Sequence, residues 1–356
     1  MTIAIKTVRC LLAIALLSFG GSLTAQDEAA TAESMAPEPL TEATEAVAAE
    51  TTDTDPAAEA VAGPAVKPLP SEIKPLAPKS MLLDVVSTGN RLFAVGDRGA
   101  IIASADGEEW AQVVVPVRAA LTAVSFADAD NGWAVGHDAA IVRTRDGGKT
   151  WVLQNFAPEL EKPLLDVMFV DANRGFAVGA YGLMYETSDG GDNWTEVQSE
   201  IRADELHFNA IMRLNNGDIL LAGEQATLGI STDNGATWSK LASPYEGSLF
   251  GALALGEKGA AIFGLRGHAY ITEDARAGEW KTVTTDTVAS MFGGTTLPDG
   301  GVALVGLNGN IVVMDASGGN VRLLKTPSGT PLSAAVAFGG GLLAVGESGV
   351  QRIALQ

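Results

Sequence analysis

The sequence predicts an all-β protein, a seven-bladed β-propeller built from four-stranded antiparallel blades. Three observations support this prediction. A short apolar motif ending in glycine recurs seven times, each repeat contains several strand-like segments, and a turn rich in Asp and Gly precedes the last of them. Repeats of about 40 to 45 residues that contain four strands are typical of propeller blades.

The recurring motif reads FAVG, WAVG, FAVG, LLAG, AIFG, ALVG and LAVG along the chain. Its final glycines are 40 to 44 residues apart, at Gly96, Gly136, Gly179, Gly223, Gly264, Gly306 and Gly346. In the third repeat the segments LDVMFV, GFAVG, LMYET and WTEV are short, rich in β-branched and aromatic residues, and bounded by Gly, Asp or Asn, as strands are. No repeat has an apolar period of about 3.6 residues, which excludes helical repeats.

A second motif lies between the third and fourth strands of most repeats. In the second repeat, TRDGGKTW resembles the Asp-box or BNR repeat, Ser/Thr-x-Asp-x-Gly-x-Thr-Trp. We expect its Asp to accept hydrogen bonds from turn N–H groups and its Gly to supply a positive φ. We expect its Trp to pack between neighbouring sheets while the indole N–H still donates a hydrogen bond. The predicted structural pairs are Asp106 and Trp110, Asp146 and Trp151, Asp189 and Trp194, Asp233 and Trp238, and Asp274 and Trp280; the sixth repeat keeps Asp315 without a Trp.

The seventh repeat contains only three predicted strands, at Leu332–Phe338, Leu342–Gly346 and Val350–Leu355. An open ring would leave unpaired strand edges. We therefore predict that Ile73–Leu76 closes the ring as the missing outer strand of the last blade. The prolines around this segment suit an edge strand, where a missing N–H group is tolerated.

The N-terminus predicts export. Lys6 and Arg9 precede the apolar run Leu11–Phe19, which is shorter than the roughly 20 residues that span a bilayer. We expect residues 1–25 to be a signal peptide cleaved near Ala25, and the mature protein to be periplasmic. The single cysteine, Cys10, precedes the apolar run, so the mature chain would have no thiol for disulfides, metal sites or nucleophilic catalysis.

Residues 26–66 are rich in Ala, Glu, Thr and Pro, with 10 acidic residues and no basic or aromatic one. Such a segment cannot bury enough apolar surface to order itself, so we predict a disordered acidic linker. The propeller would then occupy residues 67–356. Residues 81–356 carry 32 acidic and 18 basic residues, which argues against a nucleic-acid partner. No segment reads as a membrane-inserting helix.

The sequence offers no catalytic constellation, and we predict no enzyme activity, no metal and no cofactor. The three histidines, His137, His207 and His268, lack metal-ligand spacing, and there is no GxSxG motif or phosphate-binding loop. Asp-boxes are common in sialidases, but the Arg-Ile-Pro motif of those enzymes is absent, and their propellers have six blades. A hydrolase with two converging carboxylates remains an alternative, as does a glycan- or polymer-binding propeller.

The strings AVGDRGAIIAS, WAVGHDAAIVRTRDGGKTW and FAVGAYGLMYETSDGGDNW resemble the photosystem II stability and assembly factor family and its bacterial relatives. The resemblance covers about residues 81–356. It implies an exported propeller that binds newly made membrane-protein subunits in the cell envelope and assists their assembly, without catalysis. Two features depart from the family pattern. One is the acidic segment 26–66. The other is the strongly negative charge, which weakens the expectation that this chain shares an arginine-rich binding patch with the family.

We expect the binding residues to lie in the VG-x-x-G turns between strands two and three. In a four-stranded antiparallel blade these turns share a face with the links between blades, opposite the Asp-boxes. Their first glycine recurs while the next two positions vary, and loops on a rigid scaffold commonly carry function. The predicted binding residues are Arg98, His137, Tyr181, Glu224, Arg266 and Glu347. The expected partner is a membrane-protein complex or one of its subunits, bound by a monomer that does not itself enter the membrane.

Overall fold

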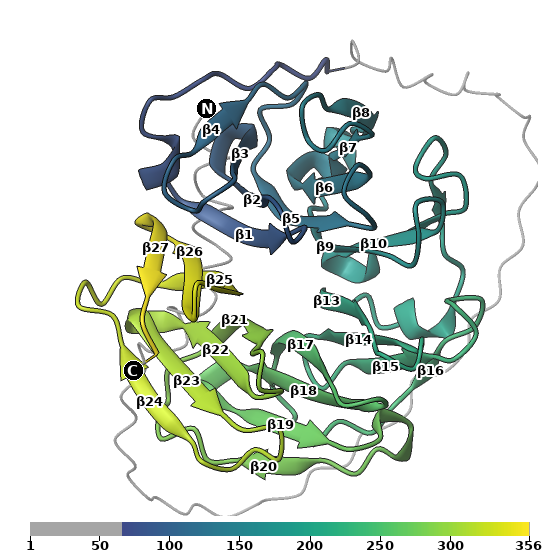
Figure 1. Cartoon of the computed structure of the whole chain (residues 1–356). Helices are drawn as coiled ribbons and strands as arrows, with labels where there is room; N and C mark the ends of the chain where they lie inside the picture. The colour runs from purple at the N-terminus through teal and green to yellow at the C-terminus, as the bar shows by residue number, and fades with distance from the viewer. Residues whose placement is uncertain (1–65, 356) are drawn as a thin grey trace, which may run out of the picture. The chain divides into compact units, whose positions relative to one another are not determined.

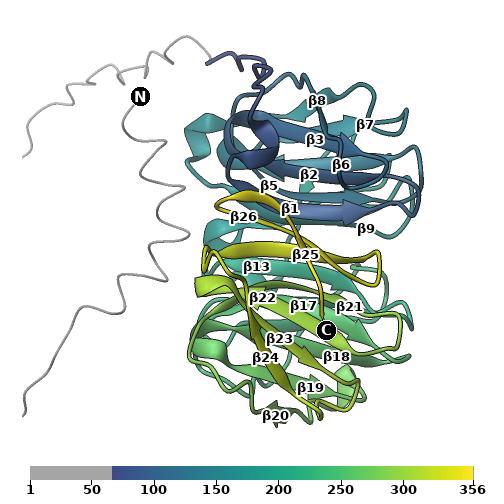
Figure 2. The same ribbon diagram turned by 60° about the vertical axis from the view of Figure 1, so that its left-hand side comes forward.

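The computed structural model describes residues 66–355, which form seven sheets arranged in a ring (Figure 1). The predicted signal peptide and almost all of the predicted acidic linker lie outside these residues. Six sheets have four antiparallel strands and the seventh has three. The strands of all blades run between the same two faces of the ring (Figure 2). The prediction of an all-β, seven-bladed propeller is therefore confirmed.

The blades follow one another along the chain, and we number them one to seven. Blade one contains β1 Leu82–Ser87, β2 Leu92–Gly96, β3 Ala100–Ser104 and β4 Ala111–Val113, and blade two contains β5 Leu121–Phe126, β6 Gly132–Gly136, β7 Ile141–Thr144 and β8 Val152–Asn155. Blade three contains β9 Leu164–Phe169, β10 Gly175–Gly179, β11 Met184–Thr187 and β12 Thr195–Glu196. Blade four contains β13 Phe208–Arg213, β14 Ile219–Gly223, β15 Leu228–Ser231 and β16 Ser239–Lys240. Blade five contains β17 Leu249–Leu255, β18 Gly259–Gly264, β19 Ala269–Thr272 and β20 Lys281–Val283. Blade six contains β21 Met291–Thr296, β22 Val302–Gly306, β23 Asn310–Met314 and β24 Arg322–Lys325. Blade seven contains β25 Leu332–Phe338, β26 Gly341–Gly346 and β27 Gly349–Ile353.

The second strand of each blade forms the centre of the core. In blades one to six every residue of this strand is buried, because a neighbouring blade covers each face of the sheet. This explains why the recurring motif is a continuous apolar run rather than an alternating one. Seven apolar clusters result, one at each seam between adjacent blades.

The motif glycine is required by close packing rather than by its backbone angle. Gly136 has an extended φ of −179°, which any residue adopts. A Cβ added there would lie 2.0 Å from the carbonyl oxygen of Ala120, in the link that enters the blade. Gly96 approaches Met81 in the same way, at 2.3 Å. The glycines thus let each link pass directly over the end of its blade's second strand.

The Asp-box turns have the predicted geometry. In blade two the Asp146 carboxylate accepts the backbone N–H of Thr150 at 2.9 Å and its hydroxyl at 2.6 Å. Gly148 has a φ of +76°. Trp151 is 6% exposed and stands edge-on to Phe126, with ring centroids 6.1 Å apart. One expectation was wrong: the indole nitrogens of all five Asp-box tryptophans are buried without a hydrogen-bond partner within residues 66–355.

The predicted closing strand at Ile73–Leu76 does not form, and blade seven keeps three strands. The segment instead runs along blade one, where the Ser71 N–H donates to the carbonyl oxygen of Val115 at 2.8 Å. Its prolines remove N–H groups that a strand would need, and both Ile73 and Leu76 are more than half exposed. Closure comes from the apolar cluster between blades seven and one, which also includes Ala77 of the 3₁₀ turn η2 (Ala77–Lys79).

Between residues 66 and 355 the structure contains no helix long and apolar enough to cross a membrane.

Candidate binding face

The VG-x-x-G turns lie beside the links between blades, as predicted, and together they form a surface that we call the link face. In blade two the N–H of His137 donates to the carbonyl oxygen of Ala120 in the link, whereas Gly147 of the Asp-box turn bonds to Asp130 in the loop between strands one and two. The third residue of six turns has a φ of 47° to 60° although none is glycine: Arg98, Asp138, Tyr181, Gln225, Arg266 and Asn308. Such left-handed residues cost free energy and persist only where the surroundings fix them, so the turns hold their side chains in defined positions.

Blades three and four join two of the predicted residues through a third side chain. The exposed Tyr181 ring stands edge-on to the His207 imidazole, with centroids 4.7 Å apart. His207 Nδ1 lies 3.7 Å from the Glu224 carboxylate. The Lys162 ammonium lies 6.0 Å from the centre of the Tyr181 ring, within cation–π range. This group presents an aromatic surface with both signs of charge beside it, and we call it the Tyr181 cluster.

Blade five carries a second aromatic group on the same face. The Tyr245 ring stacks on the His268 imidazole at 4.1 Å, and the Tyr270 hydroxyl lies 3.2 Å from His268 Nδ1. The predicted residue Arg266 is exposed at the tip of the adjacent turn. Its charge acts on the Tyr245 hydroxyl, whose pKa is raised chiefly by burial and lowered in part by Arg266.

The turns of blades one and two carry the predicted residues Arg98 and His137, which differ in exposure. Arg98 is exposed, and its Nε lies 3.4 Å from the carboxylate of Asp97. His137 is largely enclosed, and burial lowers its pKa because the charged imidazolium is disfavoured there. Its Nε2 atom has no hydrogen-bond partner in the described part of the chain. Burial therefore favours the neutral imidazole of His137 at neutral pH.

The structure brings the predicted residues together only in part. Tyr181 and Glu224 share one cluster, Arg266 joins another, and Glu347 is exposed at the blade-seven turn without a contact to either. Sequence reasoning missed His207 and Tyr245 as partners because both lie in links between blades. An aromatic or imidazole ring in a short link between two apolar repeats is the signal that would have identified them.

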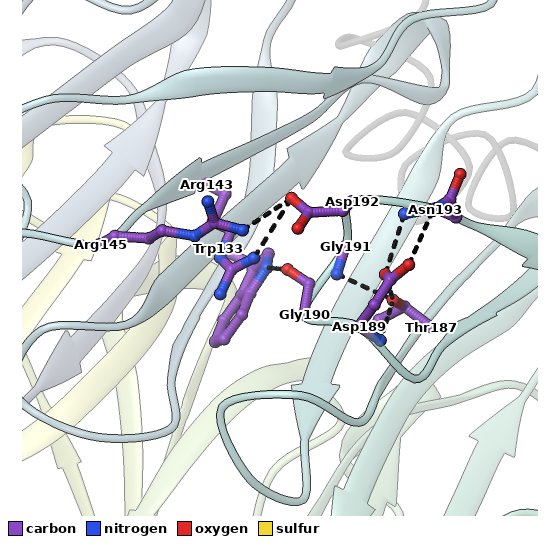
Figure 3. Close-up of polar contacts among 9 residues, drawn as sticks. All are labelled: Trp133, Arg143, Arg145, Thr187, Asp189, Gly190, Gly191, Asp192 and Asn193. Atoms are coloured by element: carbon purple, nitrogen blue, oxygen red, sulfur yellow. Dashed lines mark hydrogen bonds and ion pairs between the residues drawn. The ribbon is translucent and has the colours of Figure 1, made fainter.

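A charged cluster also lies on the opposite face, across the seam between blades two and three (Figure 3). The guanidinium of Arg143 is 7% exposed and lies 5.0 Å from the centre of the Trp133 ring. Arg145 and Arg143 approach the same oxygen of Asp192, at 2.6 Å and 3.6 Å. The Trp133 indole N–H donates to the carbonyl oxygen of Gly190 at 2.9 Å. Sequence reasoning missed this cluster, because Arg143 and Arg145 lie at the end of β7 and just after it, whereas Asp192 lies in the next repeat.

The cleft beside this cluster measures about 150 Å³ and is lined by Arg143, Arg145, Asp146, Thr150, Val152 and Gln154. Both guanidinium groups pair with Asp192, whereas Asp146 accepts hydrogen bonds from Thr150, which lower its pKa to about 2. The ion pairs with Asp192 connect blade two to blade three. Within residues 66–355 no three His, Cys, Asp or Glu side chains gather as metal ligands.

Comparison with known proteins identifies the family. The family described as photosynthesis system II assembly factor YCF48 matches residues 102–162 and 152–321, which together span more than half of the chain. The chain belongs to this family. The photosystem II assembly protein Ycf48 of Thermosynechococcus vestitus is 40% identical over 50 residues, an alignment that covers 14% of each protein.

Solved structures show the same architecture. A YCF48 bound to D1 peptide superposes with a TM-score of 0.62 and 17% identity, over 78% of this chain and 94% of that one. YCF48 from Cyanidioschyzon merolae has a TM-score of 0.62 and 19% identity, over 76% of this chain and 94% of that one. At these identities the similarity establishes the fold.

Proposed function

We propose that this chain is a non-catalytic assembly factor that acts in the periplasm and binds segments of membrane-protein subunits through its link face. The observation that carries the proposal is the family match, which extends from the third strand of blade one to the turn before the fourth strand of blade six. A structurally similar YCF48 is bound to a D1 peptide, which supports a polypeptide rather than a small molecule as the ligand.

The link face suits such a partner. The exposed Tyr181 supplies flat apolar surface, and the adjacent Lys162 and Glu224 supply charges of both signs. Tyrosines of this kind are enriched among the residues that contribute most to protein interfaces. Contacts of the Tyr181 ring with His207 and Lys162 hold this side chain in place before binding, which reduces the entropy lost on association.

Site-specific photo-cross-linking tests this proposal. A photoreactive amino acid at position 181 of the full chain is expected to cross-link to one or a few membrane-protein subunits in membranes of the source organism, identified by mass spectrometry. The matched control carries the same group at Lys149, an exposed position on the Asp-box face. Equal products from both positions, or none from position 181, would contradict the proposed link-face site.

Export is tested separately. The chain recovered from a periplasmic fraction should begin at Gln26, and an intact mass that retains residues 1–25 would contradict it.

A further inference from the structure

Five seams of the propeller are filled by an Asp-box tryptophan. Each of these indoles packs in the apolar cluster between its own blade and the preceding one: Trp110, Trp151, Trp194, Trp238 and Trp280. Trp151 and Trp194 stand edge-on to Phe126 and Phe169, with centroids 6.1 Å and 5.9 Å apart. This edge-to-face geometry is favourable for aromatic pairs.

The seam between blades six and seven lacks this filling. The sixth residue of β5 is Phe126, whereas the sixth residue of β25 is Ala337. The second residue of β2 is Phe93, whereas the second residue of β22 is Ala303. In the described residues, blade seven has no fourth strand and so no Asp-box tryptophan. Aliphatic side chains pack into the cluster at this seam, among them Leu297, Leu324 and Leu355, but the cluster contains no aromatic residue. The seam between blades five and six differs, because its cluster includes Phe263 and Val321.

A cleft of about 400 Å³ remains at this place on the Asp-box face. The residues that shape it include Leu297, Val313, Arg322, Ala337, Phe338 and Leu355. Its walls are largely apolar, and the Arg322 guanidinium at its rim donates a hydrogen bond to the carbonyl oxygen of Leu355 at 2.9 Å. The cleft therefore has the size and the lining to accept an aromatic side chain, the kind of group that fills the five tryptophan seams.

Leu355, two residues beyond the end of β27, lines the cleft. The outer edge of β27 has no strand paired to it within residues 66–355, and only Gly349 at its start lies close to η2, at Pro78. The third strands β7, β15 and β19 are buried throughout, whereas β27 is buried only at its first residue and exposes Arg352. An unpaired edge presents a row of N–H and C=O groups that an extended peptide can bind by adding a strand.

We propose that this edge and cleft form a second docking site, on the face opposite the link face. It binds an extended segment of a partner protein, which adds to β27 as a fourth strand and inserts one Trp or Phe side chain against Ala337 and Leu355. The partner thus supplies to blade seven the kind of aromatic side chain that blades one to five supply themselves. The proposal is independent of the role of the link face.

The N-terminal residues and β27 are poor sources of the aromatic group, which favours a partner protein. Residues 1–80 contain one aromatic residue, Phe19, which lies in the predicted signal peptide. The segment β27, with the sequence GVQRI, has none, so pairing of two copies along this edge would leave the cleft unfilled.

A synthetic peptide taken from blade two, TRDGGKTWVLQN (residues 144–155), serves as the probe because it carries an Asp-box, a tryptophan and an outer strand. Fluorescence anisotropy of the labelled peptide with the full chain is expected to show saturable binding. Replacing the peptide's tryptophan by alanine should weaken binding roughly tenfold or more, as for other interface aromatic anchors.

The matched variants are Ala337→Trp, which fills the cleft from within, and Ala129→Trp, which adds the same side chain at an exposed position on the same face. Ala337→Trp should weaken peptide binding at least about tenfold without lowering the melting temperature, whereas Ala129→Trp should bind as wild type does. The proposal is overturned if the peptide does not bind, if Ala337→Trp binds it equally well, or if the chain is a dimer that Ala337→Trp dissociates. Binding that appears only after removal of residues 26–66 would assign the edge to the chain's own N-terminal segment and would also overturn it.

Discussion

Two carboxyl groups in the first strands of blades one and three make the stability of the propeller depend on pH. Asp84 accepts the N–H of Val124 in blade two at 2.8 Å, and Asp166 accepts the N–H of Ile211 in blade four at 2.8 Å. Burial raises the pKa of Asp84 to about 6 and that of Asp166 to about 7, because the charged carboxylate loses its hydration.

The sign of the effect follows from proton binding. In the unfolded chain an aspartate titrates near about 3.9, so between roughly pH 4 and 7 the folded state binds protons that the unfolded state has lost. Stability contributed by these groups is therefore fully present below about pH 4 and falls as the pH rises to about 7. At about 1.4 kcal/mol per pKa unit, the loss is on the order of 3 kcal/mol for Asp84 and 4 kcal/mol for Asp166.

The assay is denaturant unfolding at half-unit steps from pH 4 to 8 for wild type, Asp84→Asn and Asp166→Asn. Asparagine resembles the protonated acid at every pH. As the pH rises, stability relative to wild type should therefore increase by roughly 3 kcal/mol for Asp84→Asn and roughly 4 kcal/mol for Asp166→Asn. His137 acts in the opposite direction, because its lowered pKa makes the protein lose stability below about pH 6.5, so only the difference between wild type and variant isolates each carboxyl. Asp130→Asn, at an exposed position, is the control. A difference that stays constant within about 0.5 kcal/mol across the range would refute the reasoning.

Three further outcomes are expected. Trp151→Ala should lower the unfolding free energy by about 3–5 kcal/mol, since it empties the seam between blades one and two; a loss below 1 kcal/mol in chemical denaturation would contradict the packing argument. Gly136→Ala should destabilise the protein by about 1–3 kcal/mol, because its Cβ would lie 2.0 Å from the Ala120 carbonyl oxygen, and an unchanged melting temperature would show that the link can move. Arg143→Met keeps the length of the side chain but removes its cation–π and ion-pair contacts, so it should lower the unfolding free energy by about 1–2 kcal/mol. Capture of the partner protein should be unchanged. Loss of capture by a folded variant would mean that the Arg143 cluster binds a ligand.

The sequence predicted the blades well because each blade depends on local patterns. The apolar run ending in Gly136, the turn at Asp146 and the plug at Trp151 lie within one repeat, and their roles follow from strand and turn chemistry. The sequence did not predict how strongly each of the predicted binding residues is buried. His137 has the same turn position as Glu224 and Glu347, yet burial lowers its pKa and encloses its ring. Nothing in the VG-x-x-G pattern distinguishes these environments, because the links between blades create them.

The prediction of a closing strand was wrong for a related reason. A missing fourth strand and a proline-rich segment made Ile73–Leu76 the natural candidate, but the ring closes without it through the cluster between blades seven and one. The sequence by itself therefore determined the number of blades, their strands, the Asp-box turns and the family, since these rest on contacts within about 40 residues of chain. Tertiary structure alone decided the unpaired edge of β27, the cleft at Ala337, and the contacts between Tyr181, His207 and Glu224. Each of these depends on which blades lie side by side in a closed ring, and no local pattern carries that information.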